Sequence, residues 1–259
     1  MTTAAAPRRS RRAVAWIVVA VLLAVGLPVA GEVAARIIAP QLIRDRIVQN
    51  LGLAADTQID VEIPAPLLLP LVVVGQLPEL RLSAQDVELD GFTGDVEVVA
   101  QDVPMYRDAD WSDADATVVL DETQTRALLS RVEGFPADAF ALDPPEIALD
   151  TQFAVFGVEV PVGVRLSAEA SEGRILLSPT SFRLAGADVS ADALRQQLGP
   201  LAGSFVEDWP VCVAGYLPAA MRLEDVAIED RGVVASFEID SSILNDPAAQ
   251  AAGACADAS

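Results

Sequence analysis

Four carboxylates lie close together in the stretch "RDADWSDADA", at Asp108, Asp110, Asp113 and Asp115. Clustered carboxylate oxygens are the ligands that Ca²⁺ prefers in proteins. An EF-hand loop that began at Asp108 would need Gly at position 113 and Glu at position 119, where this chain has Asp113 and Val119. Two interpretations stay open, a solvated acidic loop and a loose Ca²⁺ site, and we assign no metal ligands.

The chain lacks two residue types on which many enzymes depend. It contains no His and no Lys, and all 17 of its basic residues are Arg. Histidine is the commonest general base, and lysine forms Schiff bases with carbonyl substrates. No P-loop, Gly-x-Ser-x-Gly or Cys-x-x-Cys motif is present either. We therefore expect a protein that is not an enzyme, with no catalytic residues and no cofactor. A carboxylate-dependent hydrolase is the remaining enzymatic option.

The charge balance excludes one class of partner. The formal net charge is −21 over 259 residues, and four of the Arg residues lie within the first twelve positions, so the rest of the chain is more acidic still. A body of this charge repels the phosphates of nucleic acids. We therefore expect no nucleic-acid partner.

An unusually apolar segment, "PAPLLLPLVVVG", spans residues 64–75. Its prolines cannot donate a hydrogen bond to a strand neighbour, so a central β-strand is not expected here. Two interpretations remain: the segment packs on the core as an irregular edge, or it contacts lipid by dipping into a bilayer or gating a lipid tunnel. The second interpretation makes its aliphatic residues the candidate lipid-binding residues, namely Leu67, Leu68, Leu69, Leu71, Val72, Val73 and Val74.

The N-terminus predicts export from the cytoplasm. The basic stretch "RRSRR" precedes eighteen uncharged residues, Ala13 to Ala30, which as a helix span about 27 Å, close to the thickness of a bilayer's hydrocarbon core. The Arg cluster should stay in the cytoplasm. The segment is either an uncleaved anchor or a signal peptide cut near residues 29–31. Outside the cytoplasm, Cys212 and Cys255 can form a disulfide, the alternative being two unpaired thiols.

Hydrophobic periodicity divides the exported part into helices and strands. Residues 32–53 carry apolar side chains at helical spacing, and Pro40 should kink or divide that helix. Two further helices are expected to start after Asp121 and Ser190, whose side chains can cap them. Alternation at period two predicts antiparallel strands within residues 59–63, 80–98, 158–184 and 221–239.

Two distant segments share one pattern. "GQLPELRLSAQDVELDG" begins at Gly75 and "GYLPAAMRLEDVAIEDRG" begins at Gly215. Both contain Gly-x-Leu-Pro, an Arg-Leu pair and an Asp-Val pair. A spacing this long does not suit a solenoid and favours a duplicated helix-plus-strands unit. The matched Arg81 and Arg222 alternate with apolar neighbours, so we interpret them as solvated side chains in preference to ligands for a lipid phosphate.

These features together resemble the LmeA-like envelope proteins of actinobacteria, a family long catalogued as a domain of unknown function. The resemblance rests on the N-terminal anchor, the amphipathic helix, the Gly-x-Leu-Pro loop before "LRLSAQDVELDG" and the mid-chain "T/S-x-x-x-R-x-LL" helix, and it covers residues 32–244. It implies an extracytoplasmic protein that binds phospholipids, including phosphatidylinositol types, and a link in mycobacteria to mannosylated lipoglycans. It also implies a fold similar to tubular lipid-binding (TULIP-like) proteins.

The resulting expectation is an α+β fold in which a curved antiparallel sheet wraps amphipathic helices. Residues 1–31 would be the Arg cluster with its anchor or signal peptide, residues 32–244 the lipid-binding domain and residues 245–259 a disordered Ala-rich tail. The protein would enclose phospholipid acyl chains at the outer side of the plasma membrane, with a membrane glycosyltransferase as one conceivable partner. The alternative function is a scaffold for a membrane enzyme that binds no lipid.

Overall fold

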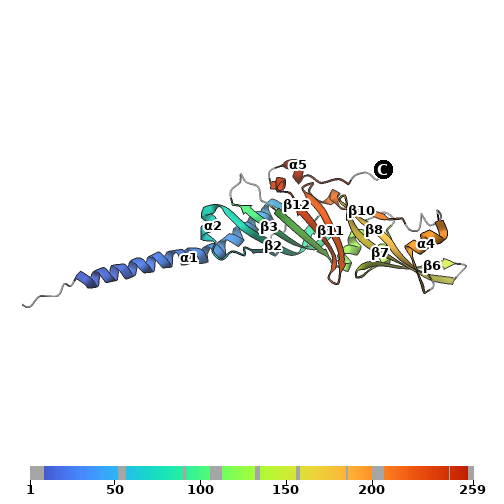
Figure 1. Cartoon of the computed structure of the whole chain (residues 1–259), viewed down its shortest axis with the longest axis horizontal. Helices are drawn as coiled ribbons and strands as arrows, with labels where there is room; N and C mark the ends of the chain where they lie inside the picture. The colour runs from blue at the N-terminus through green and yellow to red at the C-terminus, as the bar shows by residue number, and fades with distance from the viewer. Residues whose placement is uncertain are drawn as a thin grey trace, which may run out of the picture.

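The computed structural model describes residues 9–51, 57–89, 92–105, 113–131, 135–155, 158–184, 186–199, 207–244 and 246–255. Within these residues the chain forms one long N-terminal helix followed by two antiparallel sheets (Figure 1). The α+β class is confirmed. The strands form two six-stranded sheets where a single curved sheet was expected, because the strands in the middle of the chain pair with one another.

Helix α1 runs without interruption from Arg9 to Leu51 and contains both Pro28 and Pro40. The expectation that Pro40 would divide the helix is therefore wrong, since a proline removes only one hydrogen bond of a helix that is otherwise continuous. Within α1, Val18–Asp45 is long and apolar enough to cross a membrane by length and composition. The N-terminal part of α1 projects from one end of the molecule (Figure 1).

Sheet A has the strand order β1-β2-β3-β4-β12-β11. Its β1 to β4 precede the second sheet in the chain, and β11 and β12 follow that sheet. All neighbours are antiparallel. The strands are β1 (Ile59–Glu62), β2 (Gln76–Leu89), β3 (Phe92–Pro104), β4 (Asp113–Leu120), β11 (Met221–Glu229) and β12 (Gly232–Ile239).

Sheet B has the strand order β10-β8-β7-β6-β5, with β9 paired to β8. Its strands are β5 (Phe140–Asp143), β6 (Glu146–Val155), β7 (Val158–Ser171), β8 (Arg174–Leu184), β9 (Ala187–Ser190) and β10 (Trp209–Cys212). A tight turn joins β7 to β8, and in it Glu172 and Gly173 adopt left-handed conformations with φ of 48° and 77°.

The remaining helices are short and connect the strands. They are α2 (Leu69–Val74), α3 (Glu122–Leu129), α4 (Ala191–Leu198) and α5 (Pro247–Gln250), with 3₁₀ turns at Ala137–Ala139, Ala214–Tyr216 and Ser241–Leu244. Both predicted caps are confirmed. The Asp121 side chain accepts a hydrogen bond from the Gln124 backbone N–H in a capping box, and Ser190 accepts one from Ala193.

The two segments with a shared pattern occupy comparable places in sheet A. Each follows a short helical turn and forms the first strand of a hairpin, β2 with β3 and β11 with β12. Each strand also has an irregularity between its Arg-Leu and Asp-Val pairs, at Ala84/Val87 and at Leu223/Asp225. Three residues separate the two pairs in the first segment and one residue separates them in the second, and this difference falls at a β-bulge, where a strand can take up extra residues.

The matched arginines are solvated, as expected. Arg81 forms an ion pair with Glu79, and this hydrogen bond raises the pKa of Arg81. Arg222 forms an ion pair with Glu238 at 2.6 Å. Both guanidinium groups are at least half exposed, so they belong to the charged outer surface.

The main hydrophobic core lies between the two sheets. It combines buried residues of β4, β11 and β12 with residues of β6, β7 and β8, and its most deeply buried members are Phe140, Leu166 and Leu177. Strand β11 also contacts β7 directly. The two sheets therefore share one core.

The predicted disulfide between Cys212 and Cys255 is present, with the Cα atoms 6.0 Å apart. It joins β10 of sheet B to the C-terminal segment. That segment is also held by the backbone of Gly253, whose N–H donates to the Leu217 carbonyl at 2.8 Å. The tail therefore closes over the end of the strand-rich region that contains β10 and β11.

Reduction of this disulfide should lower the midpoint of thermal unfolding. The bond closes a loop across 43 positions of sequence, and removing such a constraint costs about 4 kcal/mol of stability. Calorimetry with and without a reductant measures the effect. The Cys255→Ser variant should show the reduced midpoint under both conditions, and an unchanged midpoint in the reduced wild type would contradict the expectation.

Candidate functional site

A cavity of about 100 Å³ lies between the two sheets and is open on one side. Sheet A contributes residues of β4, β11 and β12, including Val118, Ala235 and Phe237. Sheet B contributes residues of β6, β7, β8 and β10, and α3 contributes Leu128 and Leu129. Segments from both halves of the chain are therefore needed to build its wall.

The wall of the cavity is almost entirely aliphatic. Among the residues that the structure describes, no carboxylate or arginine lines it. Its two polar residues are Thr125 and Tyr216, and the buried Thr125 hydroxyl already donates to the Leu120 carbonyl at 3.3 Å. A water molecule in a buried site needs two to four polar partners, so this cavity favours an apolar occupant such as a hydrocarbon chain.

Helix α3 is placed over the cavity by its N-terminal cap and by an ion pair. The capping box of Asp121 and Gln124 starts the helix directly after β4. Farther along, Arg126 forms an ion pair with Glu122 at 2.7 Å and donates to the Phe140 carbonyl at 2.8 Å. These contacts hold the helix between β4 and β5, so that its apolar face is turned towards the cavity.

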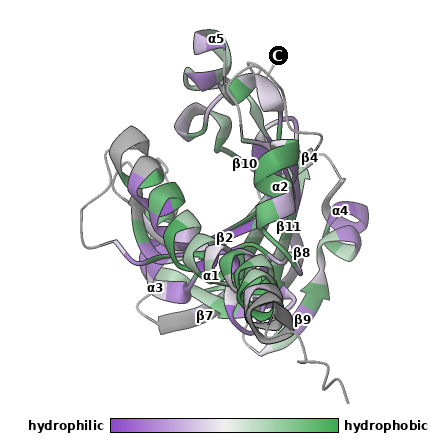
Figure 2. Cartoon of the chain, turned by 90° about the vertical axis from the view of Figure 1, so that its left-hand side faces the viewer, coloured by the Kyte–Doolittle hydropathy of each residue, from purple (hydrophilic) through white to green (hydrophobic). Residues whose placement is uncertain are grey.

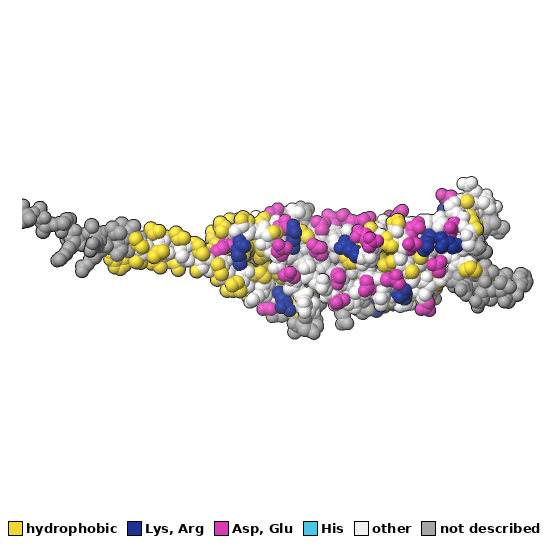
Figure 3. All heavy atoms as spheres, turned by 90° about the horizontal axis from the view of Figure 1, so that it is seen from below, with side chains coloured by type: hydrophobic (Ala, Val, Ile, Leu, Met, Phe, Trp, Pro, Cys, Tyr) yellow, Lys and Arg dark blue, Asp and Glu magenta, His cyan; other side chains and the backbone are white. Residues whose placement is uncertain are grey.

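A second apolar surface lies where α1 meets the folded body. The short helix α2 leaves Leu67, Val73 and Val74 exposed, with relative accessibilities of 55%, 86% and 71%. Hydrophobic side chains cover the α1 rod and the adjoining end of the body, whereas acidic side chains are spread over the body farther away (Figure 3). Viewed along α1, the apolar character of α1 and part of α2 is visible at this end (Figure 2).

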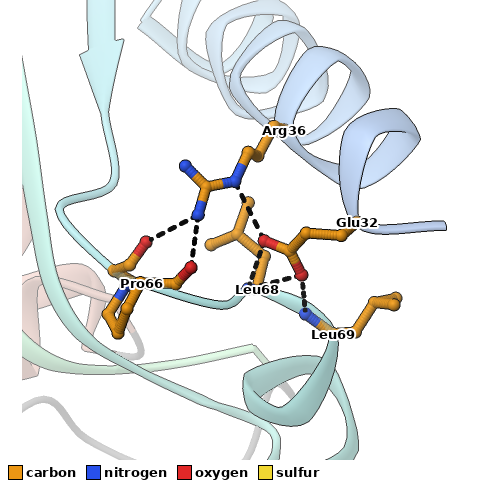
Figure 4. A network of polar contacts seen from close by, with 6 residues as sticks. Glu32, Arg36, Pro66, Leu68 and Leu69 are labelled. Atoms are coloured by element: carbon orange, nitrogen blue, oxygen red, sulfur yellow. Dashed lines mark hydrogen bonds and ion pairs between the residues drawn. The ribbon is translucent and has the colours of Figure 1, made fainter. Parts of the chain in front are cut away.

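A polar network fixes α2 to α1 (Figure 4). The Glu32 carboxylate accepts hydrogen bonds from the backbone N–H groups of Leu68 and Leu69 at 2.8 to 3.1 Å. It also forms an ion pair with Arg36 at 2.9 Å, and Arg36 in turn donates to the carbonyls of Ala65 and Pro66. The network therefore ties the backbone that leads into α2, residues 65–69, to a single turn of α1.

The residues predicted from the apolar segment are distributed unevenly. Leu68 is buried, with 5% accessibility, and Leu69 and Leu71 are half-buried. Leu67, Val72, Val73 and Val74 are exposed. The absence of a central strand was predicted, but the short helix was not, because six residues with two flanking prolines show no helical period.

The acidic stretch gives no site in the part of the chain that the structure describes. Asp108 and Asp110 lie outside the described residues, whereas Asp115 is exposed on β4. Among the described residues, no group of three His, Cys, Asp or Glu side chains could hold a metal ion. The carboxylate-dependent hydrolase gains no support from the cavity, since no carboxylate lines it.

The residues that line the cavity were not identified from the sequence as a site. Their only signal is strand alternation, which predicts that they point inwards but cannot distinguish a filled core from a hollow one. The difference depends on how the two sheets approach each other.

We expect the Glu32→Ala variant to loosen α2. Two backbone N–H groups lose their acceptor and Arg36 loses its ion pair, so amide exchange at Leu68 and Leu69 should accelerate about tenfold or more. Hydrogen–deuterium exchange on the full chain in nanodiscs measures this rate. The matched control is Asp45→Ala, which removes an exposed carboxylate farther along α1. Equal exchange in the two variants would contradict the proposed role of Glu32.

Comparison with known proteins identifies the family. Searches of curated proteins and of solved structures find no match. A family model described as "LmeA-like phospholipid-binding" matches residues 30–238, which cover both sheets and the part of α1 that contacts α2. By its name this is a lipid-binding family and not an enzyme family. The chain belongs to the LmeA-like phospholipid-binding family.

Proposed function

We propose that the protein holds a phospholipid at the outer face of the plasma membrane, with the end of an acyl chain enclosed in the cavity between the sheets. The observation that carries this proposal is the aliphatic wall of the cavity, whose buried hydroxyl is already hydrogen-bonded. Each CH₂ group that leaves water for such a site contributes about 0.8 kcal/mol. The enclosure of one chain therefore needs no charged residue inside the cavity.

The compartment is inferred from two features. The apolar helix α1 follows a cluster of arginines, which favours a cytoplasmic N-terminus and an exported body. The Cys212–Cys255 disulfide suits an oxidising environment outside the cytoplasm. In this proposal residues 1–31 anchor or export the protein, residues 32–244 bind lipid and residues 245–259 form the tail.

The exposed part of the apolar segment would lie in the outer leaflet. Glu32 follows nineteen residues of α1 from Ala13 to Gly31, a length of about 28 Å that nearly crosses the hydrocarbon core. Because Glu32 binds the backbone at Leu68 and Leu69, α2 lies at the depth where the membrane ends. Leu67, Val73 and Val74 would then contact lipid, as would the half-buried neighbours Leu69 and Leu71.

The finer identity of ligand and partner follows only from the family. A phosphatidylinositol-type lipid, a role in lipoglycan or envelope lipid assembly and a glycosyltransferase partner are parts of the proposal, as is the relation to TULIP-like folds in which a sheet wraps a helix. The alternative is a scaffold that binds no lipid, and it predicts an empty cavity in the purified protein.

The Ala235→Phe variant tests the enclosure of an acyl chain. Ala235 lines the cavity from β12, so a phenyl ring there should occupy the space and lower the amount of bound phospholipid about tenfold. Native mass spectrometry of the full chain, incubated with deuterated phosphatidylinositol or phosphatidylcholine and then stripped of loosely bound lipid by detergent exchange, measures occupancy.

The matched control is Ser236→Phe. Ser236 is also half-buried on β12 but points to the opposite face of sheet A. A stoichiometric adduct in wild type and in the control, but not in Ala235→Phe, would support the proposal. A wild-type protein without bound phospholipid would favour the scaffold.

A fluorescent label at position 73 tests the contact with the membrane. Because both native cysteines are in the disulfide, a Val73→Cys variant carries one reactive thiol. A nitrobenzoxadiazole label there should shift its emission to the blue in liposomes and be quenched by lipids with nitroxide groups in their acyl chains. The same label at Asp192→Cys, on α4, should remain in water, and equal quenching at the two positions would overturn the proposed orientation.

A further inference from the structure

One face of sheet A is apolar across its full width. Residues paired directly in neighbouring antiparallel strands lie on the same face. The strand registers connect one such row through all six strands, and its members are Val61, Leu82, Val98, Ala116, Phe237 and Leu223. A second row beside it consists of Ile59, Ala84, Val96, Val118, Ala235 and Val226. All twelve side chains are apolar.

The opposite face of the same strands is polar. The apolar rows therefore mark one particular face and do not merely reflect a high overall content of apolar residues in these strands. On β3, the side chains that alternate with Val96 and Val98 include those of Asp95 and Glu97, both exposed. Two paired positions on that face are occupied by Arg81 and Asp115, which flank Val99 on either side. The apolar face therefore has to be covered by something, whereas the polar face suits solvent.

The two ends of the apolar face are covered in different ways. At the β1 end, Val61 is buried and α1 contacts β1. At the other end, Ala116, Phe237 and Leu223 belong to the main core, and Val118, Ala235 and Phe237 line the cavity. One end therefore adjoins the membrane helix and the other adjoins the proposed acyl-chain site.

The middle of the apolar face is less well covered, although helix α3 contacts β3. Leu82, Ala84 and Val96, on β2 and β3, are only half-buried, and none of the three belongs to either buried cluster of the described residues. We call these three residues the central strip. It connects the part of sheet A that α1 covers with the part that lines the cavity.

We propose that the central strip is a second lipid-binding site, over which an acyl chain of a phospholipid lies between α1 and the cavity. This inference rests on the proposed function. An acyl chain is the occupant that suits both ends, because the strip is continuous with the membrane-crossing helix on one side and with the aliphatic cavity on the other. Six strands at a spacing of about 4.8 Å give a face roughly 24 Å wide, longer than the acyl layer of one leaflet, which is half of a 30 Å core.

The site has a functional consequence. A phospholipid that leaves the outer leaflet beside α1 would keep its chain on an apolar surface until the chain end reaches the cavity. The chain would not need to enter water on the way, where each exposed CH₂ costs free energy. The strip would therefore determine how fast the protein takes up phospholipid, whereas the cavity would determine what fraction of the protein carries phospholipid at equilibrium.

Photo-crosslinking of the wild-type chain tests the location directly. The full protein is placed in nanodiscs that contain phosphatidylcholine with a diazirine group near the end of one acyl chain, irradiated, digested and mapped by mass spectrometry. Crosslinks to peptides of β2 and β3 around Leu82 and Val96, together with crosslinks to the strands of the cavity, are expected. Crosslinks confined to α1, α2 and the cavity strands would overturn the inference.

A pair of matched variants tests the effect on loading. Val96→Glu places a carboxylate in the central strip, and Val99→Glu places one on the polar face of the same strand at a position of similar burial. The rate at which the protein takes up fluorescent phosphatidylcholine from donor vesicles should fall about tenfold or more in Val96→Glu, because a carboxylate strongly disfavours a neighbouring hydrocarbon chain. The rate in Val99→Glu should stay within about twofold of wild type. Val96→Trp, which narrows the strip without a charge, should also slow loading.

The outcomes separate the two proposals. If wild-type protein carries no phospholipid, the proposed function fails and this inference fails with it. If wild type carries phospholipid but the two glutamate variants load equally fast, the central strip is not part of the route and the cavity site stands. Thermal unfolding of each variant shows whether a slow rate reflects a lost fold, and the crosslinks in wild type decide the matter if Val96→Glu does not fold.

Discussion

The structure depends on the need to cover the apolar face of sheet A. Strand alternation places twelve apolar side chains in two rows on that face. Each segment that packs against this face removes part of it from water. Helix α1 covers the β1 end, and α3 with sheet B covers the β4, β12 and β11 end. The cavity is the remaining space where the two sheets do not fully interdigitate.

The same constraint explains how a lipid-binding protein can be so acidic. Carboxylates and arginines alternate with the apolar residues and are confined to the outer faces, where several form ion pairs such as Arg222 with Glu238 and Arg183 with Asp188. Exposed pairs of this kind contribute little stability, because water and salt screen the attraction between the charges. The negative charge disfavours contact with anionic headgroups, so the proposed location at the membrane depends on the apolar helix α1.

Hydrogen bonds connect helix α1 to the folded body. Glu32 and Arg36 occupy one turn of α1 and bind four backbone groups in residues 65–69. Because these partners are backbone groups, the contact fixes the position of the chain itself and not merely that of a side chain. The exposed valines of α2 therefore have a defined relation to the membrane helix, which supports a fixed depth for the body above the bilayer.

Much of this protein could be read from its sequence. Period-two alternation predicted seven of the described strands, namely β1, β2, β3, β7, β8, β11 and β12, but not β4, β5, β6, β9 or β10. Asp121 and Ser190 predicted the starts of α3 and α4, and the cysteines predicted the disulfide that is present. The parallel between the segments at Gly75 and Gly215 predicted two comparable hairpins. These features depend on local backbone preferences or on pairs of residues, so they can be recognised from the amino-acid sequence.

Other features were decided only by the tertiary structure. Alternation shows which side chains of a strand share a face, but the pairing order β1-β2-β3-β4-β12-β11 joins strands that are more than 100 residues apart, and that order alone creates the two continuous rows. The hollow between the sheets has the same residue types as a filled core, since its existence depends on the distance between two surfaces. The partners of Glu32 are backbone N–H groups. Because every residue except proline has such a group, the residue types in the sequence do not indicate which ones Glu32 binds. The sequence thus determined the apolar surfaces of this protein, and the packing of the sheets decided where those surfaces leave room for a ligand.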